Sequence, residues 1–244
     1  MATTTGKIIQ AITIQDRISE LRDQIEQLTE EAGRPPSSVH LLAVSKGQPI
    51  ESILSAYAGG ISDFGESYWQ ETQEKIQTLL TLQNMTPPIR WHFIGHLQRN
   101  KLKKIAQQVD WVHSVCREEE LLALAKHREG HEQRLQICIQ VHVSGALGKR
   151  GVTETELLAL AKKAKTLAPL CLRGLMVMLQ PGLSQDEQYH AFSRVHALYD
   201  QLNQQEALGL DTLSMGMSGD FTQAIRAGST WVRMGRGLFH YLAQ

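Results

Sequence analysis

The chain has 244 residues, and its 25 Lys and Arg residues balance its 25 Asp and Glu residues, so the formal net charge is zero. No basic run or charged tail stands out, which argues against nucleic acid or an anionic membrane as a partner. The opening residues lack the apolar core of a secretory signal, and no apolar run approaches the ~20 residues of a membrane span. These features predict a soluble cytoplasmic protein.

Cysteine and histidine spacing gives no sign of a disulfide framework or a metal site. The three cysteines are far apart and form no Cys-x-x-Cys pair, so we expect reduced thiols, with Cys138 and Cys171 in buried strands. His92 and His96 are four residues apart, but Gly95 lies between them and a strand pattern precedes them, which argues against a metal-binding helix face. We therefore predict no metal and expect packed or hydrogen-bonded histidines.

Predicted strands and helices alternate along the whole chain. Apolar residues recur at spacings of three and four from residue 12 to residue 31, which predicts a leading helix. Short apolar runs predict strands at 39–46, 61–65, 90–94, 111–115, 135–143, 171–178, 212–214 and 231–234. Helical patterns follow them at 49–57, 66–80, 100–106, 117–128, 153–167, 185–204 and 220–227, and Thr153 with Glu156 forms a capping-box pattern.

Eight such units joined by short connections predict an α/β fold with a parallel sheet and right-handed crossovers. Within this length, eight short strands favour closure into a barrel over an open sheet. The sequence therefore predicts a single (β/α)8 TIM barrel domain over residues 12–244, with an extra N-terminal helix that caps or flanks it. Residues 1–11 are predicted to be an N-terminal extension.

The first predicted strand ends in a single lysine, Lys46, which Gly47 and Pro49 follow. Ligands of such barrels lie at the C-terminal ends of the strands. Low-dielectric walls there would disfavour the charged amine, and a neutral amine can form a Schiff base with a carbonyl. The competing interpretation is a solvated loop lysine. The residues at the predicted strand ends are Lys46, Glu66, His96, His113, His142, Met178, Ser214 and Arg233.

Two glycine-containing segments near the C-terminus predict a phosphate site. Residues 214–220 follow strand seven and open a helix, where glycines allow close backbone approach and Ser218 can act as N-cap or phosphate ligand. Residues 233–237 directly follow strand eight, and these two loops commonly build a phosphate site in this fold. Ordinary turn formation is the alternative. The candidate binding residues are Lys46, Ser214, Gly216, Ser218, Gly219, Arg233, Gly235 and Arg236.

A strand-end lysine opposite a phosphate site predicts an aldehyde-bearing phosphate ester as the ligand. Pyridoxal 5′-phosphate (PLP) meets both requirements. Other phosphorylated carbonyl compounds also meet them, including the sugar phosphates of Schiff-base aldolases. Neither a nucleotide P-loop nor a dinucleotide-binding glycine pattern occurs in either segment.

Seven motifs in order, between about Val39 and Phe239, resemble the pyridoxal phosphate homeostasis protein family. They lie at 42–46, 64–68, 91–101, 112–114, 172–176, 213–218 and 228–235. The resemblance implies a barrel similar to the N-terminal domain of alanine racemase, with PLP bound as an imine to the lysine that matches Lys46. It also implies phosphate contacts from residues 214–218 and 233–236. Ser67 stands where the family usually has Asn, and Arg236 replaces a small hydroxyl residue.

The resemblance implies a PLP carrier without catalytic turnover, which affects the balance of amino acids and keto acids. PLP-dependent apoenzymes are the expected recipients, and a monomer is the expected state because no β-rich racemase-type second domain is predicted. One alternative is a PLP-dependent racemase or Schiff-base lyase, and another is a regulatory interaction scaffold. An enzyme would need a further acid or base, for which the candidates are Tyr68, His96, His113, Cys116 and His142.

Overall fold

Eight parallel strands close into a barrel in sequence order, and the last strand pairs with the first. The computed structural model describes residues 12–82, 85–143 and 150–239. The strands are β1 (His40–Val44), β2 (Asp63–Glu66), β3 (Arg90–Phe93), β4 (Trp111–Val115), β5 (Leu135–Gln140), β6 (Leu170–Met176), β7 (Thr212–Met217) and β8 (Trp231–Met234). The predicted (β/α)8 barrel is confirmed.

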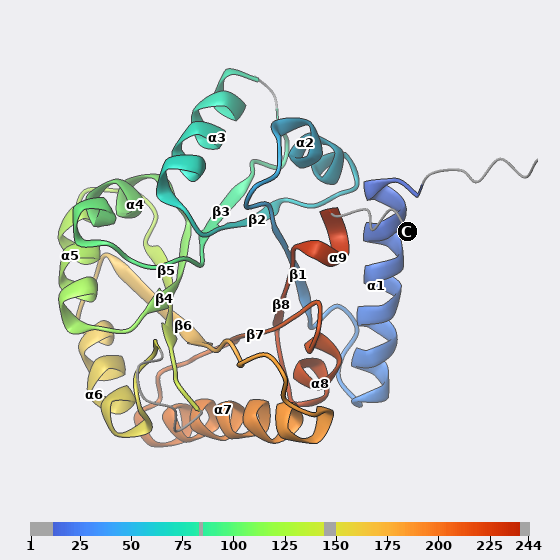
Figure 1. Ribbon diagram of the computed structural model, residues 1–244. Helices are drawn as coiled ribbons and strands as arrows, with labels where there is room; N and C mark the ends of the chain where they lie inside the picture. Colours follow the sequence, from blue (N-terminus) through green and yellow to red (C-terminus); the bar gives the residue numbers. More distant parts are fainter. Residues whose placement is uncertain (1–11, 83–84, 144–149, 240–244) are drawn as a thin grey trace, which may run out of the picture.

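Helices form a ring outside the strands (Figure 1). They are α1 (Ile14–Glu31), α2 (Ile50–Ala58), α3 (Trp69–Thr81), α4 (Leu102–Gln108) with the 3-10 turn η1 (Arg99–Lys101) before it, α5 (Glu118–Arg128), α6 (Glu154–Lys165), α7 (Gln185–Glu206), α8 (Phe221–Arg226) and α9 (Arg236–Phe239). The leading helix α1 packs against α2, α8 and α9, so it flanks the barrel as predicted.

The sequence of α1 explains both its start and its packing. Thr13 and Asp16 form a capping box, in which the Asp16 N–H donates to Thr13 Oγ1 and the Thr13 N–H donates to Asp16 Oδ2. Ile18, Leu21 and Ile25 share one face and are buried, and each stabilises the fold by about 1.5–3 kcal/mol. Residues 1–11 lie outside the described residues, and the predicted domain boundary stays a prediction.

Two of the predicted element boundaries that differ from the structure lie near the candidate site. Glu66 is the last residue of β2, and α3 begins only at Trp69, so Glu66 does not open that helix. β7 runs on to Met217, which places Ser214 inside the strand instead of at its end. The glycine at 216 resembles a loop signal in the sequence, but β7 pairs irregularly with β8 between residues 214 and 217 and accommodates it there.

The layer between strands and helices is apolar, whereas the barrel interior is largely polar. Phe64, Phe93 and Phe192 are among the largest fully buried side chains and belong to the main hydrophobic cluster. Side chains alternate along each strand, so residues of the other series point inside the barrel. Six polar residues of this inward series are buried: Asp63, His92, His113, Gln140, Ser214 and Arg233.

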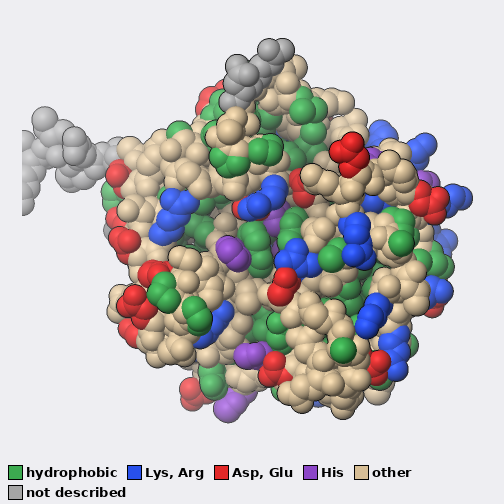
Figure 2. All heavy atoms as spheres, turned by 180° about the vertical axis from the view of Figure 1, so that it is seen from behind, with side chains coloured by type: hydrophobic (Ala, Val, Ile, Leu, Met, Phe, Trp, Pro, Cys, Tyr) green, Lys and Arg blue, Asp and Glu red, His purple; other side chains and the backbone are tan. Residues whose placement is uncertain are grey.

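The surface opposite to the view of Figure 1 carries both signs of charge. Figure 2 shows Lys and Arg side chains interspersed with Asp and Glu, with histidines among them. This distribution agrees with the zero net charge of the sequence. In the described parts of the chain, no helix combines the length and the apolar character that a membrane crossing requires.

Candidate functional site at the barrel mouth

Lys46 lies in the turn that follows β1, at the C-terminal mouth of the barrel. The Ser45 N–H donates to Gly65 O at 3.0 Å, so the parallel ladder continues up to the residue before the lysine. Leu42 faces inward, because a Cβ added to Gly65 would lie 3.2 Å from its Cδ2 atom. Alternation then assigns Val44 to the same inward series, and Lys46 follows two residues later, in the turn beyond the strand. Lys46 is nevertheless exposed, so the expectation that apolar walls enclose its amine is wrong.

A buried polar cluster holds the backbone on the N-terminal side of Lys46. The Lys75 Nζ atom donates to Ser45 O at 2.6 Å and to Glu66 Oε1 at 2.7 Å, and the Ser45 hydroxyl donates to the same carboxylate oxygen at 2.7 Å. Glu66 is fully buried. Burial raises the pKa of Glu66 above its ordinary value, and the hydrogen bonds from Lys75 and Ser45 oppose that shift.

The same cluster holds the backbone on the C-terminal side of Lys46. Glu71 Oε1 accepts hydrogen bonds from the Lys75 ammonium at 2.6 Å and from the Gly47 N–H. Helix α3 carries both Glu71 and Lys75, one turn apart, so its first turns face the end of β1. We call Ser45, Glu66, Glu71 and Lys75 the lysine support. None of its members was a candidate site residue in the sequence, apart from Glu66 as a strand-end residue.

The loops after β7 and β8 meet at the rim of the mouth. The Gly237 N–H donates to Ser218 Oγ at 3.3 Å, which joins the start of α9 to the loop before α8. A Cβ added to Gly219 would have no heavy atom within 4 Å, so this loop presents an open surface. Arg236, the first residue of α9, is exposed beside it. The predicted binding residues Ser218, Gly219 and Arg236 therefore lie together.

The turn before α8 is held by a carboxylate and not by Ser218. Asp220 precedes the helix as its N-cap residue, and its Oδ1 atom accepts from the Met217 N–H at 2.6 Å. The predicted N-cap role of Ser218 is therefore wrong, which leaves its hydroxyl at the rim. Gly216 has a φ of +96°, and an added Cβ would lie 2.6 Å from the Cβ of Ala224. Gly216 is thus required for close packing of α8 on β7.

Ser214 and Arg233 lie inside the barrel, beneath the loops that were predicted to bind phosphate. Both belong to strands, and they are 0% and 2% exposed. The Arg233 guanidinium donates to Ser214 O at 2.6 Å, to Ser214 Oγ at 2.9 Å and to Val177 O at 2.8 Å. Val177 directly follows β6. The guanidinium therefore extends from β8 past β7 to the end of β6, beneath the mouth.

Pairing of β1 with β8 brings the lysine strand beside the rim loops. Ala43 pairs with Met234, and a Cβ added to Gly235 would lie 3.5 Å from Val44 O. The chain continues directly from Gly235 into α9 and from Val44 to Lys46. Lys46 and the rim of small and hydroxyl residues thus share one end of the barrel.

The candidate acids and bases are scattered over different environments. Tyr68 is 66% exposed, and His96 lies 3.4 Å from an Arg150 nitrogen. His113 is fully buried, and burial lowers the pKa of its imidazole well below the ordinary value. Burial, with a further contribution from Glu120, raises the pKa of Cys116 to about 11.

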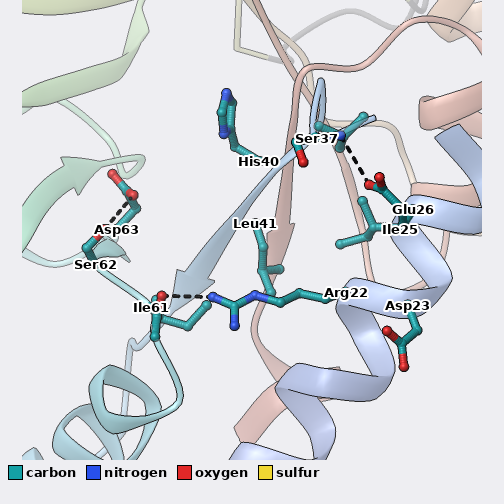
Figure 3. A pocket seen from close by; sticks show the side chains of 12 residues that line it. Arg22, Asp23, Ile25, Glu26, Ser37, His40, Leu41, Ile61, Ser62 and Asp63 are labelled. Carbon is teal, nitrogen blue, oxygen red and sulfur yellow. Dashed lines mark hydrogen bonds between the residues drawn. The ribbon is translucent and has the colours of Figure 1, made fainter. Parts of the chain in front are cut away.

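A pocket lies at the other end of the barrel, between α1 and the starts of β1 and β2 (Figure 3). Arg22 crosses it and donates to the backbone carbonyls of Gly59 and Gly60. The Asp63 side chain faces this end and lies beside Ser62. Lys46 and the rim loops are at the opposite ends of the strands, so this pocket is separate from the candidate site. Among the described residues, no cluster of metal-ligating side chains occurs.

Comparison with known proteins supports this assignment of the fold. Residues 17–243 match the family model described as the alanine racemase N-terminal domain. The pyridoxal phosphate homeostasis protein of Pseudomonas aeruginosa is 44% identical over 227 residues, which cover 93% of this chain and 95% of that protein. The protein of the same name from Pasteurella multocida is 41% identical over 229 residues, which cover 93% and 97%.

A solved structure of a relative has the same fold. PipY of Synechococcus elongatus, solved with PLP bound, superposes with a TM-score of 0.82 at 34% identity and covers 93% of this chain and 100% of its own. The sequence motifs, the barrel fold and these relatives all indicate the same family. The chain belongs to the pyridoxal phosphate homeostasis protein family, with the fold of the alanine racemase N-terminal domain.

Proposed function

We propose that this chain binds PLP at the C-terminal mouth of its barrel and holds it as a Schiff base on Lys46. The observation that supports the proposal is the β1–β8 pairing, because it brings the end of the strand before the exposed Lys46 and the strand before Gly235 to one end of the barrel, where Gly237 bonds Ser218. The amine attacks the aldehyde carbon, and the aldehyde oxygen leaves as water. The PLP-bound structure of PipY, a relative with the same fold, supports the choice of cofactor.

The residues at the mouth fit a phosphorylated aldehyde. Gly219 leaves open space beside the Ser218 hydroxyl, and Arg236 adds an exposed positive charge. The Asp220 carboxylate, which would repel a phosphate, is bonded to the Met217 N–H. Ser218, Gly219, Gly235 and Arg236 are therefore the proposed phosphate contacts, with small residues and hydrogen-bond donors suited to an anion.

We further propose a carrier role in intracellular PLP homeostasis, without catalytic turnover. The names of the relatives at 44% and 41% identity support this role. Within the barrel, His113 is already bonded on both ring nitrogens, which leaves it no free nitrogen to accept a proton from a substrate. PLP-dependent apoenzymes are the proposed recipients, and a monomer is the proposed state. The scaffold alternative requires only that the barrel folds and binds a protein partner.

The test is an absorption spectrum of the purified protein with PLP, followed by borohydride reduction and peptide mass mapping. We expect reduction to fix the cofactor on Lys46, and Lys46→Ala to abolish the imine band. Lys103→Ala, which changes an exposed lysine of α4, is the matched control and should leave the band intact. If folded protein binds no PLP, the carrier and enzyme functions are both wrong. Racemisation or lyase turnover in the loaded protein would instead identify an enzyme.

A further inference from the structure

A continuous series of hydrogen bonds crosses the barrel interior. It runs from Asp63, at the end opposite the mouth, to Arg233. The Asp63 Oδ1 atom lies 2.9 Å from His92 Nε2, and His92 Nδ1 lies 3.0 Å from His113 Nε2. His113 Nδ1 lies 2.8 Å from Ser214 Oγ, and Arg233 donates to that oxygen at 2.9 Å. All five side chains are buried, with exposed fractions of 0–7%.

The protonation of the five groups follows from their surroundings. Burial raises the pKa of Asp63, but hydrogen bonds from His92 and Arg90 outweigh it and hold the pKa below its ordinary value. Asp63 is therefore an ionised carboxylate that only accepts hydrogen bonds. Burial lowers the pKa of both His92 and His113, so both rings are neutral near pH 7. A neutral imidazole has one donor nitrogen and one acceptor nitrogen.

One direction for every hydrogen bond then follows from the carboxylate. Because Asp63 accepts, the proton of His92 is on Nε2, and its Nδ1 accepts from His113. The proton of His113 is consequently also on Nε2, so its Nδ1 accepts the hydroxyl proton of Ser214. Ser214 Oγ, with its only proton committed, presents lone pairs to Arg233. The Asp63 carboxylate, at the end opposite the mouth, thus determines that the Ser214 hydroxyl accepts a hydrogen bond from Arg233.

Ring packing holds the two histidines in these orientations. His92 stacks on Trp111 with ring centroids 5.4 Å apart and nearly parallel planes, and its centroid lies 5.0 Å from that of Trp231. His113 lies 5.6 Å from Trp111. These contacts restrict rotation of the imidazoles, which favours one fixed arrangement of donors and acceptors.

We propose that Asp63, His92 and His113 are positioning residues for the cofactor site, which orient the Arg233 guanidinium across its floor through Ser214. The inference rests on the proposed function, because Arg233 is a candidate binding residue of the sequence and lies beneath the mouth where PLP is proposed to bind. Without these hydrogen bonds, Ser214 can turn its hydroxyl proton toward Arg233. This would remove an acceptor for the guanidinium and leave its orientation less fixed. None of the three residues reaches the mouth itself.

The first measurement uses the protein without cofactor, by nitrogen-15 NMR of the histidine rings. We expect His92 and His113 to be neutral at pH 7 with the proton on Nε2 in both. A charged ring, or a proton on Nδ1 of either ring, would overturn the proposal. This result does not depend on PLP binding, so it is distinguishable from a failure of the proposed function.

The second measurement is PLP affinity in Asp63→Asn, with Asp211→Asn as the matched control. Asp211 forms a carboxylate–guanidinium pair with Arg173, as Asp63 does with Arg90, but its side-chain hydrogen bonds are to Arg173 and Thr212 instead of a histidine. We expect Asp63→Asn to weaken PLP binding about tenfold and to mix the ring tautomers, while Asp211→Asn keeps both properties. A purely structural role would lower only the melting temperature.

Unchanged affinity in folded Asp63→Asn, in protein whose wild type carries PLP on Lys46, would refute the proposal. If Asp63→Asn does not fold, His113→Gln tests the same series of hydrogen bonds, because it leaves the Asp63–Arg90 pair intact. We expect the same tenfold loss there, and wild-type affinity in that variant would equally refute the proposal.

Discussion

Replacing Lys75 with Met tests the lysine support beneath the mouth. Met keeps an unbranched side chain but removes the ammonium that bonds Ser45 O, Glu66 Oε1 and Glu71 Oε1. Glu66 is fully buried, so its carboxylate would keep only the Ser45 hydroxyl as a partner. Breaking a buried ion pair from one side costs about 3–5 kcal/mol. At about 2–4 °C per kcal/mol for a domain of this size, the melting temperature falls by roughly 6–20 °C.

The pH dependence of that loss has a definite sign. Burial raises the pKa of Glu66 in the folded protein, and removal of the Lys75 charge raises it further. Below the ordinary glutamate pKa, the folded and unfolded states of the variant are both protonated at Glu66, so the penalty is absent. As pH rises through the raised folded pKa, the unfolded state ionises more easily and the variant loses stability. The stability difference between wild type and Lys75→Met should therefore be larger at pH 7 than at pH 4.

Urea unfolding of Lys75→Met, Glu66→Leu and the double variant checks the reasoning. Replacing both partners with apolar residues leaves no unpaired buried charge, so the double variant should be more stable than Lys75→Met alone. Lys103→Met changes an exposed lysine and should stay within about 0.5 kcal/mol of wild type. The reasoning is refuted if Lys75→Met unfolds at the wild-type urea concentration, or if the double variant is the least stable of the three.

Three further outcomes are expected. Gly216→Ala should lower the free energy of unfolding by about 1–3 kcal/mol, because of the φ of +96° and the 2.6 Å approach to Ala224; a stable variant in urea melts would contradict this. Arg236→Ser should weaken PLP binding about threefold to tenfold without a change in melting temperature, and equal affinity by titration would exclude a phosphate contact. Because burial raises the pKa of Cys116 to about 11, alkylation at pH 7.5 should be roughly a hundredfold slower than for a free thiol, whereas a reaction at the free rate would show the thiol to be open to solvent.

The sequence predicts the barrel because each strand carries its own local signal. A run such as residues 135–140 is apolar and short, and a helical pattern with a capping box at Thr153 and Glu156 follows it. Lys46 and Ser218 could be identified as candidates because their place at the strand ends follows from topology alone. Strand 231–234, which carries Arg233, was predicted correctly, but the end of β7 was placed too early, at Ser214, because Gly216 resembles a loop signal.

The interior hydrogen bonds could not be predicted, because they join residues far apart in the sequence. Asp63 and His92 are 29 positions apart, and His113 and Ser214 are 101 apart. Lys75 is 30 positions from Ser45, whose carbonyl it bonds. A partial signal was present, since Asp63, His92 and His113 are polar residues next to large apolar residues in short predicted strands. Which of them meet depends on barrel closure and register, which no local pattern contains.

The charges inside the barrel explain why its two ends differ. At the end opposite the mouth, Arg90 neutralises Asp63, because its guanidinium bonds both carboxylate oxygens. At the mouth end, the partners of the Arg233 guanidinium are the neutral oxygens of Ser214 and Val177, and among the described residues no carboxylate forms an ion pair with it. Burial lowers the pKa of Arg233 to about 10, so it stays charged near pH 7. The Asp220 carboxylate offsets part of this shift. The buried positive charge beneath the mouth favours an anionic ligand there over the same ligand at the opposite end of the barrel.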